Sequence, residues 1–573
     1  MADDMDWFEN NYAEFWTLPY PPYPEQIRIL QKIDAAFRSG YKNIIVNAGT
    51  GIGKSVIATT IANLFYSAYI CTKTINLQTQ YMQDFKEMLV ELKGKKHYQC
   101  FFNRSCDNCY VEEVNKNGTI ADKKALLNGE HGRSFIFHDN ISEEEYDNII
   151  EEMMIWKCSD CPYKLALLNA QNNNYVNANY HSLYFNSHVI PRFKKRDIII
   201  FDECHNFENI MTGIIQFSLN PDEIYDNYDI YVFDAESDDL QSIDYWIKIH
   251  EDIITKLNEK KAKEVGNLQG RADDNIIKAI ESEYEQKILK IQHKITNLSS
   301  GEWFIKLPKH DDWFDSKRNN IQFKPLYGKE YTQRLLDLGE FRLFFTGTLP
   351  NHESFCRWVG ISPTETCYIY EKSPYPVENR PIYKHYLGNF NSKYNQRVNG
   401  KYIPAWMNDK VLNGVSEILQ QHQDEKILIH TSSIEQTDWL CNELSYMNFD
   451  VIPAYGESRN ENIGLFKSSD DFNILISPSI KEGVDFKGDL CTAQLIFKVP
   501  RPVYKDEVKA RCDIDKEWYN FHTIIPLMQS YGRGIRSKTD YCVTYILDSA
   551  FENLLRYNTY LFEDYFLEAI EVE

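Results

Sequence analysis

A glycine-rich turn that ends in Gly53-Lys54-Ser55 is the strongest chemical signal in the sequence. The apolar run Ile44–Val46 precedes it, and a stretch rich in Ala, Ile and Leu begins at Val56, so we expect a strand before the turn and a helix after it. In such a turn backbone N–H groups surround phosphate oxygens, a lysine reaches the β- and γ-phosphates, and a serine hydroxyl binds Mg2+. Ala48 stands where the first glycine of the pattern is usual. The residues expected to hold the nucleotide are Gly49, Thr50, Gly51, Gly53, Lys54 and Ser55.

Two adjacent carboxylates follow a second apolar run. Ile198–Phe201 predicts a buried strand, and Asp202 and Glu203 come directly after it, at the end of a parallel strand where ligands bind. We expect Asp202 to hold Mg2+, and Glu203 to orient and activate the attacking water. His205 is placed to couple this site to a second domain. Acidic residues also cap helices, and it is the upstream glycine turn that favours the catalytic interpretation.

Three further residues suggest a phosphate site shared between two lobes. Gln529, Arg533 and Arg536 have the spacing of residues that face a γ-phosphate across a cleft, with the arginines supplying charge to the transition state. We expect this run at the start of a helix.

Other polar residues lie where a nucleotide-binding motor would need them. Gln26 precedes the glycine turn by one helix, and its amide can both donate to and accept from an adenine edge. Three short motifs follow apolar runs, and the last contains Asp485, which we expect near the nucleotide: Thr346–Leu349, His430–Ser432 and Glu482–Asp485.

Five of the thirteen cysteines crowd into one segment. They form two C-x2-C pairs, Cys106 with Cys109 and Cys158 with Cys161, preceded by Cys100. Such a set can ligate either a tetrahedral zinc ion or a cubane iron–sulfur cluster, and the spacing does not choose between them. The odd total disfavours a disulfide framework.

Together these segments resemble the XPD/DinG-type DNA helicases of superfamily 2, and the resemblance extends over almost the whole chain. It is carried by Tyr23–Gln26, Asp202–Asn206, Ser373–Pro376 with Asn379–Pro381, Gln529–Arg536 and the strand-contacting motif around Thr72–Thr74 and Leu77–Gln78. The resemblance implies ATP, Mg2+ and a 4Fe-4S cluster as cofactors, single-stranded or forked DNA as partner, and 5′ to 3′ movement. By the same resemblance the cluster ligands are Cys100, Cys106, Cys109 and Cys161, with Cys158 as a substitute for Cys106.

The expected fold class is α/β, with two RecA-like P-loop domains and two inserts in the first. A chain of 573 residues is too long for one core. The domains expected are lobe 1 in three pieces (1–98, 162–210 and 321–350), a cluster insert (99–161), a helical Arch-like insert (211–320) and lobe 2 (351–573). In the helical insert, apolar residues recur at helical spacing from Ile277 to Leu298, and a helix-like stretch around Ile253 is separated from them by Gly266 and Gly270. We expect an antiparallel helical hairpin. It either helps to enclose the single-stranded DNA or is only a spacer.

The net charge of −22 is unusual for a nucleic-acid binder, although a motor can hold its strand in a local groove. No run of eighteen apolar residues and no basic leader is present, so we expect a soluble, intracellular monomer without a membrane span. Two other functions remain open at this stage. One is a translocase or remodeller that does not separate strands and carries zinc, and the other is a binding module with a vestigial motor.

Overall fold

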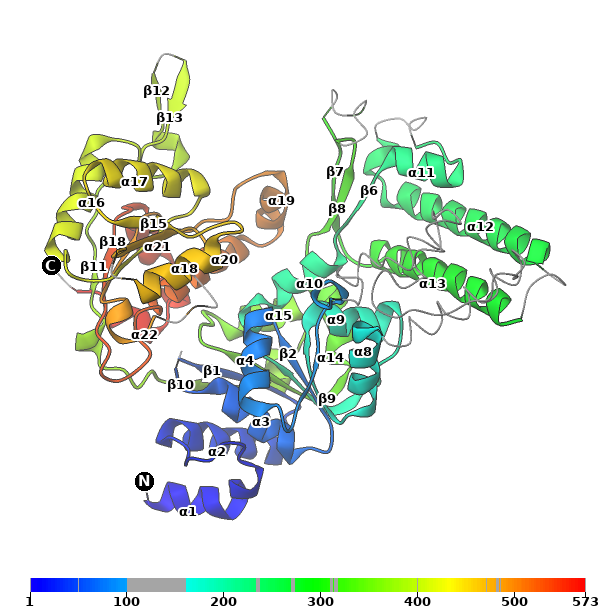
Figure 1. The fold of residues 1–573 in the computed structure, drawn as a ribbon, viewed down its shortest axis with the longest axis horizontal. Helices are drawn as coiled ribbons and strands as arrows, with labels where there is room; N and C mark the ends of the chain where they lie inside the picture. Colours follow the sequence, from blue (N-terminus) through cyan, green and yellow to red (C-terminus); the bar gives the residue numbers. More distant parts are fainter. Residues whose placement is uncertain are drawn as a thin grey trace, which may run out of the picture.

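The computed structural model describes residues 2–49, 51–99, 161–232, 238–268, 274–309, 313, 318–398, 400–469, 471–480, 484 and 486–571. Figure 1 shows two lobes side by side, with a pair of long helices projecting from the first lobe. Among the sequence-predicted site residues, Thr50, Asp485, Cys100, Cys106, Cys109 and Cys158 lie outside the described residues.

Lobe 1 is built on a seven-stranded sheet in which every pairing is parallel. Its strand order is β10 (Thr366–Glu371), β1 (Asn43–Ala48), β9 (Gly339–Thr346), β5 (Arg196–Phe201), β2 (Ala68–Thr72), β4 (Tyr175–Asn179) and β3 (Val90–Leu92). The helices of this lobe are α1 (Ala2–Asn11), α2 (Pro24–Arg38), α3 (Lys54–Leu64), α4 (Ile75–Phe85), α8 (Pro162–Asn172), α9 (Tyr180–Tyr184), α10 (Phe207–Ile215), α14 (Lys329–Leu336) and α15 (His352–Val359).

The apolar runs of lobe 1 form central strands because the sheet is buried on both faces. In β1, Ile45 belongs to one apolar core while Ile44 and Val46 belong to the other, and β5 divides its isoleucines in the same way. This alternation is what a strand between two helical layers requires. The strand predicted at Ile198–Phe201 and the helix predicted after the glycine turn are both present.

Lobe 2 contains a six-stranded parallel sheet. Its order is β11 (Ile382–Tyr383), β18 (Val543–Ile546), β17 (Ala493–Ile496), β14 (Ile427–His430), β16 (Ile474–Ser477) and β15 (Val451–Pro453). The helices are α16 (Asp409–Gln421), α17 (Ile434–Tyr446), α18 (Arg459–Ser468), α19 (Asp506–Ile514), α20 (Lys516–Tyr531), α21 (Ala550–Asn558) and α22 (Asp564–Leu567), and a two-stranded hairpin consists of β12 (Gln396–Val398) and β13 (Lys401–Ile403). The chain therefore has two parallel α/β lobes, as expected.

The boundary between the lobes differs from the one predicted at residue 350. Strand β10 pairs in parallel with β1, from Asn43 opposite Thr366 to Ala48 opposite Glu371, so the chain remains in the lobe 1 sheet up to Glu371. The first strand of the lobe 2 sheet begins at Ile382. The prediction ended lobe 1 too early because β10 is added at the edge of the sheet after a further helix, α15.

The helical insert contains two long helices, α12 (Ile243–Leu268) and α13 (Asp274–Leu298). Tyr284 donates a hydrogen bond to Glu264, and Lys261 pairs with Glu285, so the two helices run antiparallel. Helix α12 continues through Gly266, where the sequence suggested a break.

The base of this insert is a small sheet that the sequence did not predict. It has the order β6 (Phe217–Leu219), β8 (Ile321–Pro325) and β7 (Trp303–Lys306), with antiparallel pairings. The helix α11 (Pro221–Tyr228) follows β6. None of the helices in the ranges given above combines the length and the hydropathy needed to span a bilayer.

One helix of lobe 2 packs against lobe 1. Trp518, Phe521 and Ile525 of α20 belong to the same apolar core as Phe201 and Phe207 of lobe 1. This contact therefore fixes the residues at the end of β5 relative to the residues of α20, between the two lobes.

Candidate active site

The glycine turn links the end of β1 to the start of α3. Gly51 and Gly53 both have φ of +84°, a left-handed conformation that favours glycine. A Cβ atom on Gly53 would lie 2.5 Å from Nε2 of Gln26. The Lys54 ammonium donates to the carbonyl oxygens of Ala48 at 3.2 Å and Gly49 at 3.4 Å, so it lies over the turn where phosphates are expected.

Gln26 is buried behind this turn. Its Oε1 accepts a hydrogen bond from the backbone N–H of Tyr23 at 2.7 Å, and its Nε2 donates to the carbonyl of Ile52 at 2.9 Å. Both ends of the amide thus join the start of α2 to the turn. A contact with adenine stays a prediction for this residue.

Asp202 lies directly after β5 and is buried. Its Oδ2 accepts from the Tyr81 hydroxyl at 3.0 Å, and its Oδ1 accepts from the Glu203 backbone N–H at 2.9 Å. Burial and, to a lesser extent, the negative charge of Glu203 raise the pKa of Asp202 to about 6, against the opposing effect of Lys54. A divalent cation would supply the countercharge that this carboxylate lacks, and the oxygens of Asp202 and Ser55 are the hard ligands that Mg2+ prefers. The residues present therefore fit a magnesium ion.

Glu203 has a left-handed backbone, with φ of 51°. Non-glycine residues adopt this region rarely, and such strain concentrates at functional sites. Its side chain is 34% exposed, and its Oε2 lies 3.4 Å from Nδ1 of His205. Glu203 thus differs from Asp202 in remaining partly open to solvent, as a residue that handles water requires.

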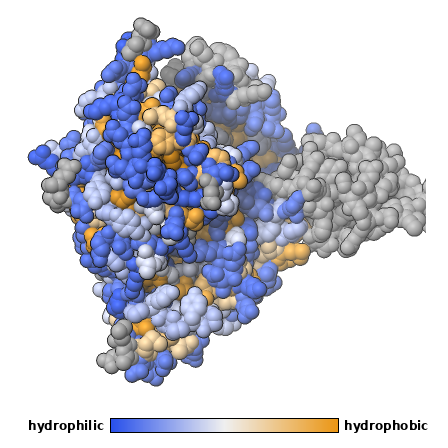
Figure 2. Space-filling model, turned by 60° about the vertical axis from the view of Figure 1, so that its left-hand side comes forward, coloured by the Kyte–Doolittle hydropathy of each residue, from blue (hydrophilic) through white to orange (hydrophobic). Residues whose placement is uncertain are grey.

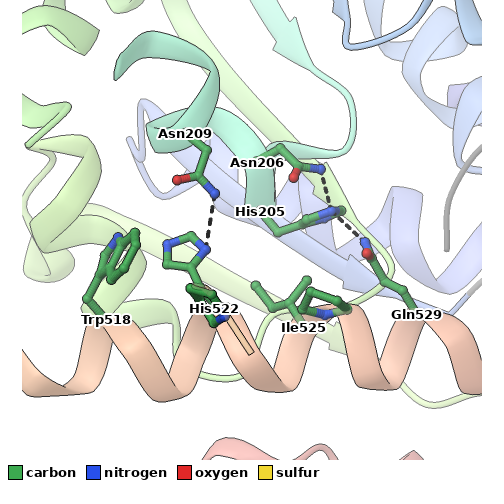
Figure 3. Close-up of a pocket in the computed structure, with 9 residues that line it drawn as sticks. His205, Asn206, Asn209, Trp518, His522, Ile525 and Gln529 are labelled. Carbon is green, nitrogen blue, oxygen red and sulfur yellow. Dashed lines mark hydrogen bonds between the residues drawn. The ribbon is translucent and has the colours of Figure 1, made fainter. Parts of the chain in front are cut away.

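His205 connects the two lobes. Its Nδ1 lies 2.9 Å from the Thr346 hydroxyl in lobe 1, and its Nε2 lies 2.6 Å from the Gln529 amide nitrogen in lobe 2 (Figure 3). Because the amide donates to Nε2, Nδ1 carries the proton and donates to Thr346. This is the interlobe position expected for His205.

The sequence suggested that Gln529 lies at the start of a helix. In the structure it lies near the C-terminal end of α20. The helix begins at Lys516, where the Asp515 carboxylate caps it by accepting from the N–H of Glu517. Arg533 follows the helix and is buried, and it donates to the carbonyls of Gln529 at 3.1 Å and Val484 at 3.0 Å.

Residues near Arg536 close over the glycine turn from the other side. A Cβ atom on Gly51 would lie 1.8 Å from the Tyr375 hydroxyl oxygen and 3.0 Å from the Arg536 carbonyl oxygen. Tyr375 also donates to that carbonyl at 3.0 Å. The segment between the lobes and the run after α20 therefore meet at the turn, and glycine is the residue that leaves room for them.

The structure adds Glu563, a site residue that the sequence did not indicate. Its Oε1 accepts from the Asn47 amide at 2.9 Å and from the Leu349 N–H at 2.6 Å, so a lobe 2 carboxylate lies at the end of β1. Burial raises its pKa, while Asn47, the N–H of Leu349, His205 and Lys54 lower it. No motif surrounds this residue, so no sequence signal was available to find it.

A cavity of about 230 Å3 lies between α10 and α20 (Figure 3). Its lining includes Trp518, His522 and Gln529 from lobe 2 and His205, Asn206 and Asn209 from lobe 1. Asn209 and His522 are joined by a hydrogen bond of 3.1 Å across it. The interface beside the His205–Gln529 contact is therefore only partly filled, and Pro502, Ile525 and Pro526 add apolar surface to these polar groups.

Gln78, from the motif around Thr72–Gln78, and Tyr180, at the start of α9, are buried within lobe 1. Gln78 donates to the carbonyls of Leu92 at 3.0 Å and Asn177 at 3.1 Å, and Tyr180 donates to the Asp202 carbonyl at 3.1 Å. The structure thus gives Gln78 and Tyr180 packing roles.

Cys161 is the one member of the cysteine cluster within the described residues. It precedes α8 and is half-buried. The rings of Tyr98 and Tyr163 lie 5.7 Å apart, so the chain enters and leaves residues 100–160 at neighbouring points. This arrangement is compatible with Cys100 and Cys161 serving one centre.

The chain matches two family models. Residues 19–221 match "Type III restriction enzyme, res subunit" and residues 415–564 match "Helicase C-terminal domain". The first match begins in lobe 1 and includes the glycine turn and Asp202, and the second lies in lobe 2 and includes Gln529.

Individual relatives and solved structures that resemble the chain are XPD helicases. The General transcription and DNA repair factor IIH helicase subunit XPD/RAD3 of Saccharomyces cerevisiae is 24% identical over 247 residues, which are 36% of this chain and 32% of that protein. The match spans about a third of the relative's length. A solved XPD helicase structure superposes with a TM-score of 0.54 at 16% identity, covering 94% of this chain and 98% of the other. A solved XPD apo structure gives 0.50 at 17% identity, with 93% and 98% covered. The chain is therefore similar to XPD helicases in sequence over about a third of its length and in fold over most of it.

Proposed function

We propose that the protein is an ATP-dependent DNA helicase that moves along single-stranded DNA. The observation that carries the proposal is the shared site between the lobes. Lys54, Asp202 and Glu203 of lobe 1 lie beside His205, which contacts Gln529 of lobe 2. A nucleotide bound at such a site links hydrolysis to opening and closing of the lobes.

Each residue has a definite role in this proposal. The Lys54 ammonium binds the β- and γ-phosphates, while Ser55 and Asp202 hold Mg2+, which supplies charge neutralisation for phosphoryl transfer. Glu203 orients and deprotonates the attacking water. Gln529 and His205 transmit the state of the nucleotide to lobe 2, where Arg533 and Arg536 provide positive charge as the γ-phosphate leaves.

The finer features rest on the XPD-like character of the chain. We propose that Cys100, Cys106, Cys109 and Cys161 hold a 4Fe-4S cluster beside the strand, that the helical insert helps to enclose the strand, and that movement is 5′ to 3′. The closeness of Tyr98 and Tyr163 supports the first of these, because it brings the two flanks of the cysteine segment together.

A Lys54→Ala variant tests the proposal. Among the described residues the hydrogen bonds of the Lys54 ammonium go to the turn carbonyls of Ala48 and Gly49. The fold is therefore expected to persist, while ATP hydrolysis stimulated by single-stranded DNA falls at least about a hundredfold. Turnover is measured with and without DNA, beside strand displacement from a forked duplex.

Two further variants show whether a loss of turnover is specific to the nucleotide site. Lys42→Ala removes an exposed lysine at the other end of β1, paired with Glu340, and should leave turnover unchanged. Glu203→Gln should keep ATP binding and lose hydrolysis. Retained DNA-stimulated turnover in Lys54→Ala would exclude the assigned site, and turnover without strand displacement in the unaltered protein would identify a translocase instead.

A further inference from the structure

The β12–β13 hairpin projects from lobe 2, away from the sheet (Figure 1). Its base is anchored on both sides by buried aromatic residues, Phe390 and Trp406, which belong to the lobe 2 core. The Phe390 N–H donates to the Asp548 carboxylate at 3.0 Å, and the Trp406 ring meets that of Trp439 at 5.5 Å. The intervening residues are therefore held out from a fixed base.

This part of the chain is basic, in contrast to the protein as a whole. Acidic residues make up 84 of 573 positions and the net charge is −22, but residues 381–408 contain neither Asp nor Glu. Four cations lie in this stretch: Lys384, Lys393, Arg397 and Lys401. Lys384 is paired with Glu552 at 3.6 Å. The other three are exposed, and no ion pair to them is found among the described residues.

Two tyrosines lie beside these cations. Tyr394 is 49% exposed and Tyr402 is 73% exposed. The Lys393 ammonium lies 4.9 Å from the centre of the Tyr394 ring, and the Arg397 guanidinium carbon lies 5.7 Å from that of Tyr402. Arg397 and Tyr402 are directly opposite in the hairpin, so they share one face. The hairpin thus presents positive charges and ring faces together.

Contact with water is enough to explain why the cations are exposed, but it does not explain why the two tyrosine rings are exposed. Lysines commonly protect an exposed strand edge, whereas two exposed tyrosines on a segment this short add apolar area with no benefit to solubility. Figure 2 shows mainly hydrophilic atoms at the top of the molecule, with hydrophobic atoms gathered below them. A polyanion with stackable rings matches both features.

We infer that this hairpin is an additional contact for single-stranded nucleic acid, distinct from the interlobe site. Lys393, Arg397 and Lys401 bind phosphates, and Tyr394 and Tyr402 stack on bases. The inference rests on the proposed function, because the motor must bring a strand to lobe 2.

The test compares two hairpin variants with the unaltered protein. In the first, Lys393, Arg397 and Lys401 are all changed to Ala, and in the second Tyr394 and Tyr402 are changed to Ala. Binding of a fluorescent oligothymidylate is followed by anisotropy between about 50 and 200 mM salt. The cation variant should bind at least about tenfold more weakly and reduce the slope of log affinity against log salt by about 2, because about 0.7 counterions are released per phosphate contact on a single strand. The tyrosine variant should bind at least about fivefold more weakly with the slope unchanged.

Matched controls lie nearby on lobe 2. Lys410→Ala removes an exposed lysine from the start of α16, and Tyr446→Ala removes a tyrosine that is 85% exposed at the end of α17. Both should bind the oligonucleotide as the unaltered protein does. Hydrolysis of ATP without nucleic acid should be the same in all variants, since none of these residues lies at the nucleotide site.

The outcomes separate this inference from the proposed function. If the unaltered protein binds and both hairpin variants bind equally well, the inference is wrong and the helicase proposal stands. If only the cation variant is weakened, the hairpin is a general contact for polyanions such as an acidic protein segment, and the assignment to nucleic acid is overturned. If the unaltered protein does not bind single strands at all, the proposed function and the inference both fail.

Discussion

Two carboxylates from different lobes, the buried Asp202 and the half-buried Glu563, both feel the positive charge of Lys54. Burial raises the pKa of each, and Lys54 lowers both. A site with more buried negative charge than positive charge favours binding of a cation together with its anionic ligand. Mg2+ carried by ATP would bring positive charge to Asp202, while Glu563 already holds its part of lobe 2 against β1 through Asn47.

The cysteine cluster gives a prediction at the level of single residues. Anaerobically purified protein should contain about four iron atoms per chain and no zinc, with visible absorption from a 4Fe-4S cluster. Cys161→Ser should reduce the iron content and bleach the absorption, because a thiolate ligand is lost. Cys367→Ser, in strand β10, is the control and should retain the iron. A colourless protein with one zinc ion would overturn the iron–sulfur proposal and leave the motor intact.

The sequence predicted those site residues that belong to local motifs. Lys54 and Asp202 were found because a turn or a strand end immediately beside each residue dictates its position. Glu563 and Tyr81 were missed because they reach the site only through the tertiary fold, and nothing adjacent to either residue indicates a ligand. Gln529 was assigned the correct neighbourhood but the wrong end of its helix, since the capping residue Asp515 lies fourteen positions earlier.

Helix α20 is the element that joins the two lobes. It places Trp518, Phe521 and Ile525 in the lobe 1 core, and near its C-terminal end Gln529 contacts His205. A helix transmits displacement along its axis because its backbone hydrogen bonds keep it rigid. A movement at the nucleotide site is thus expected to reach the whole of this interface.

A buried ion pair fixes the other end of the interface. Arg511 of α19 donates to Glu208 of α10 at 2.6 Å, with side-chain exposures of 6% and 4%. Trp518 also donates to Glu208 at 3.3 Å. We expect Arg511→Met and Glu208→Gln each to lower the free energy of unfolding by about 3–5 kcal/mol, because each leaves a buried partner uncompensated.

The double variant Glu208→Gln with Arg511→Met distinguishes pairing from packing. Its loss in a urea titration should be well below the sum of the two single losses, since no charge remains buried. Lys287→Met, which breaks an exposed pair with Glu283, should change stability by less than about 1 kcal/mol. Strictly additive losses would mean that Glu208 and Arg511 act independently.

Elements with a strong period were predictable and short ones were not. The strands β1 and β5 and the helices α3 and α13 follow from apolar patterns long enough to specify a face. The sheet at the base of the insert was missed because strands such as Phe217–Leu219 have three residues, too few to display alternation. The edge strand β10 was missed as part of lobe 1 for a different reason, since its partner β1 lies more than 300 residues earlier.

At the scale of the whole molecule, positive charge is concentrated locally although the net charge is negative. The chain carries −22 in total, yet the cations proposed to bind the nucleic-acid strand lie together in residues 381–408, which contain no acidic residue. Repulsion from the rest of the surface weakens non-specific binding and leaves these cations to select the strand. The negative net charge is therefore consistent with a motor that binds nucleic acid.

Buried histidines make the stability of the molecule depend on pH. Burial lowers the pKa of His522, at the lobe interface, to about 3, and that of His250, in the insert, to about 4. In the unfolded chain a histidine has a pKa of about 6.5. Above this value both states are neutral and pH has no effect through these groups. Below it the unfolded chain takes up protons while the folded chain does not, so stability falls from about pH 6.5 down to about pH 3–4.

A variant at each position isolates this effect. Between pH 7.5 and pH 5, the unaltered protein should lose about 2 kcal/mol of unfolding free energy through each of these histidines. His522→Gln and His250→Gln remove the titrating group, so each should show a loss smaller by about that amount, whatever its stability at pH 7.5. Urea titrations at the two pH values measure the difference, and His385→Gln, at an exposed position, should behave as the unaltered protein does. An identical loss in His522→Gln and in the unaltered protein would mean that the interface admits a proton in the folded state, and that α20 is less tightly packed against lobe 1 than its buried aromatic contacts require.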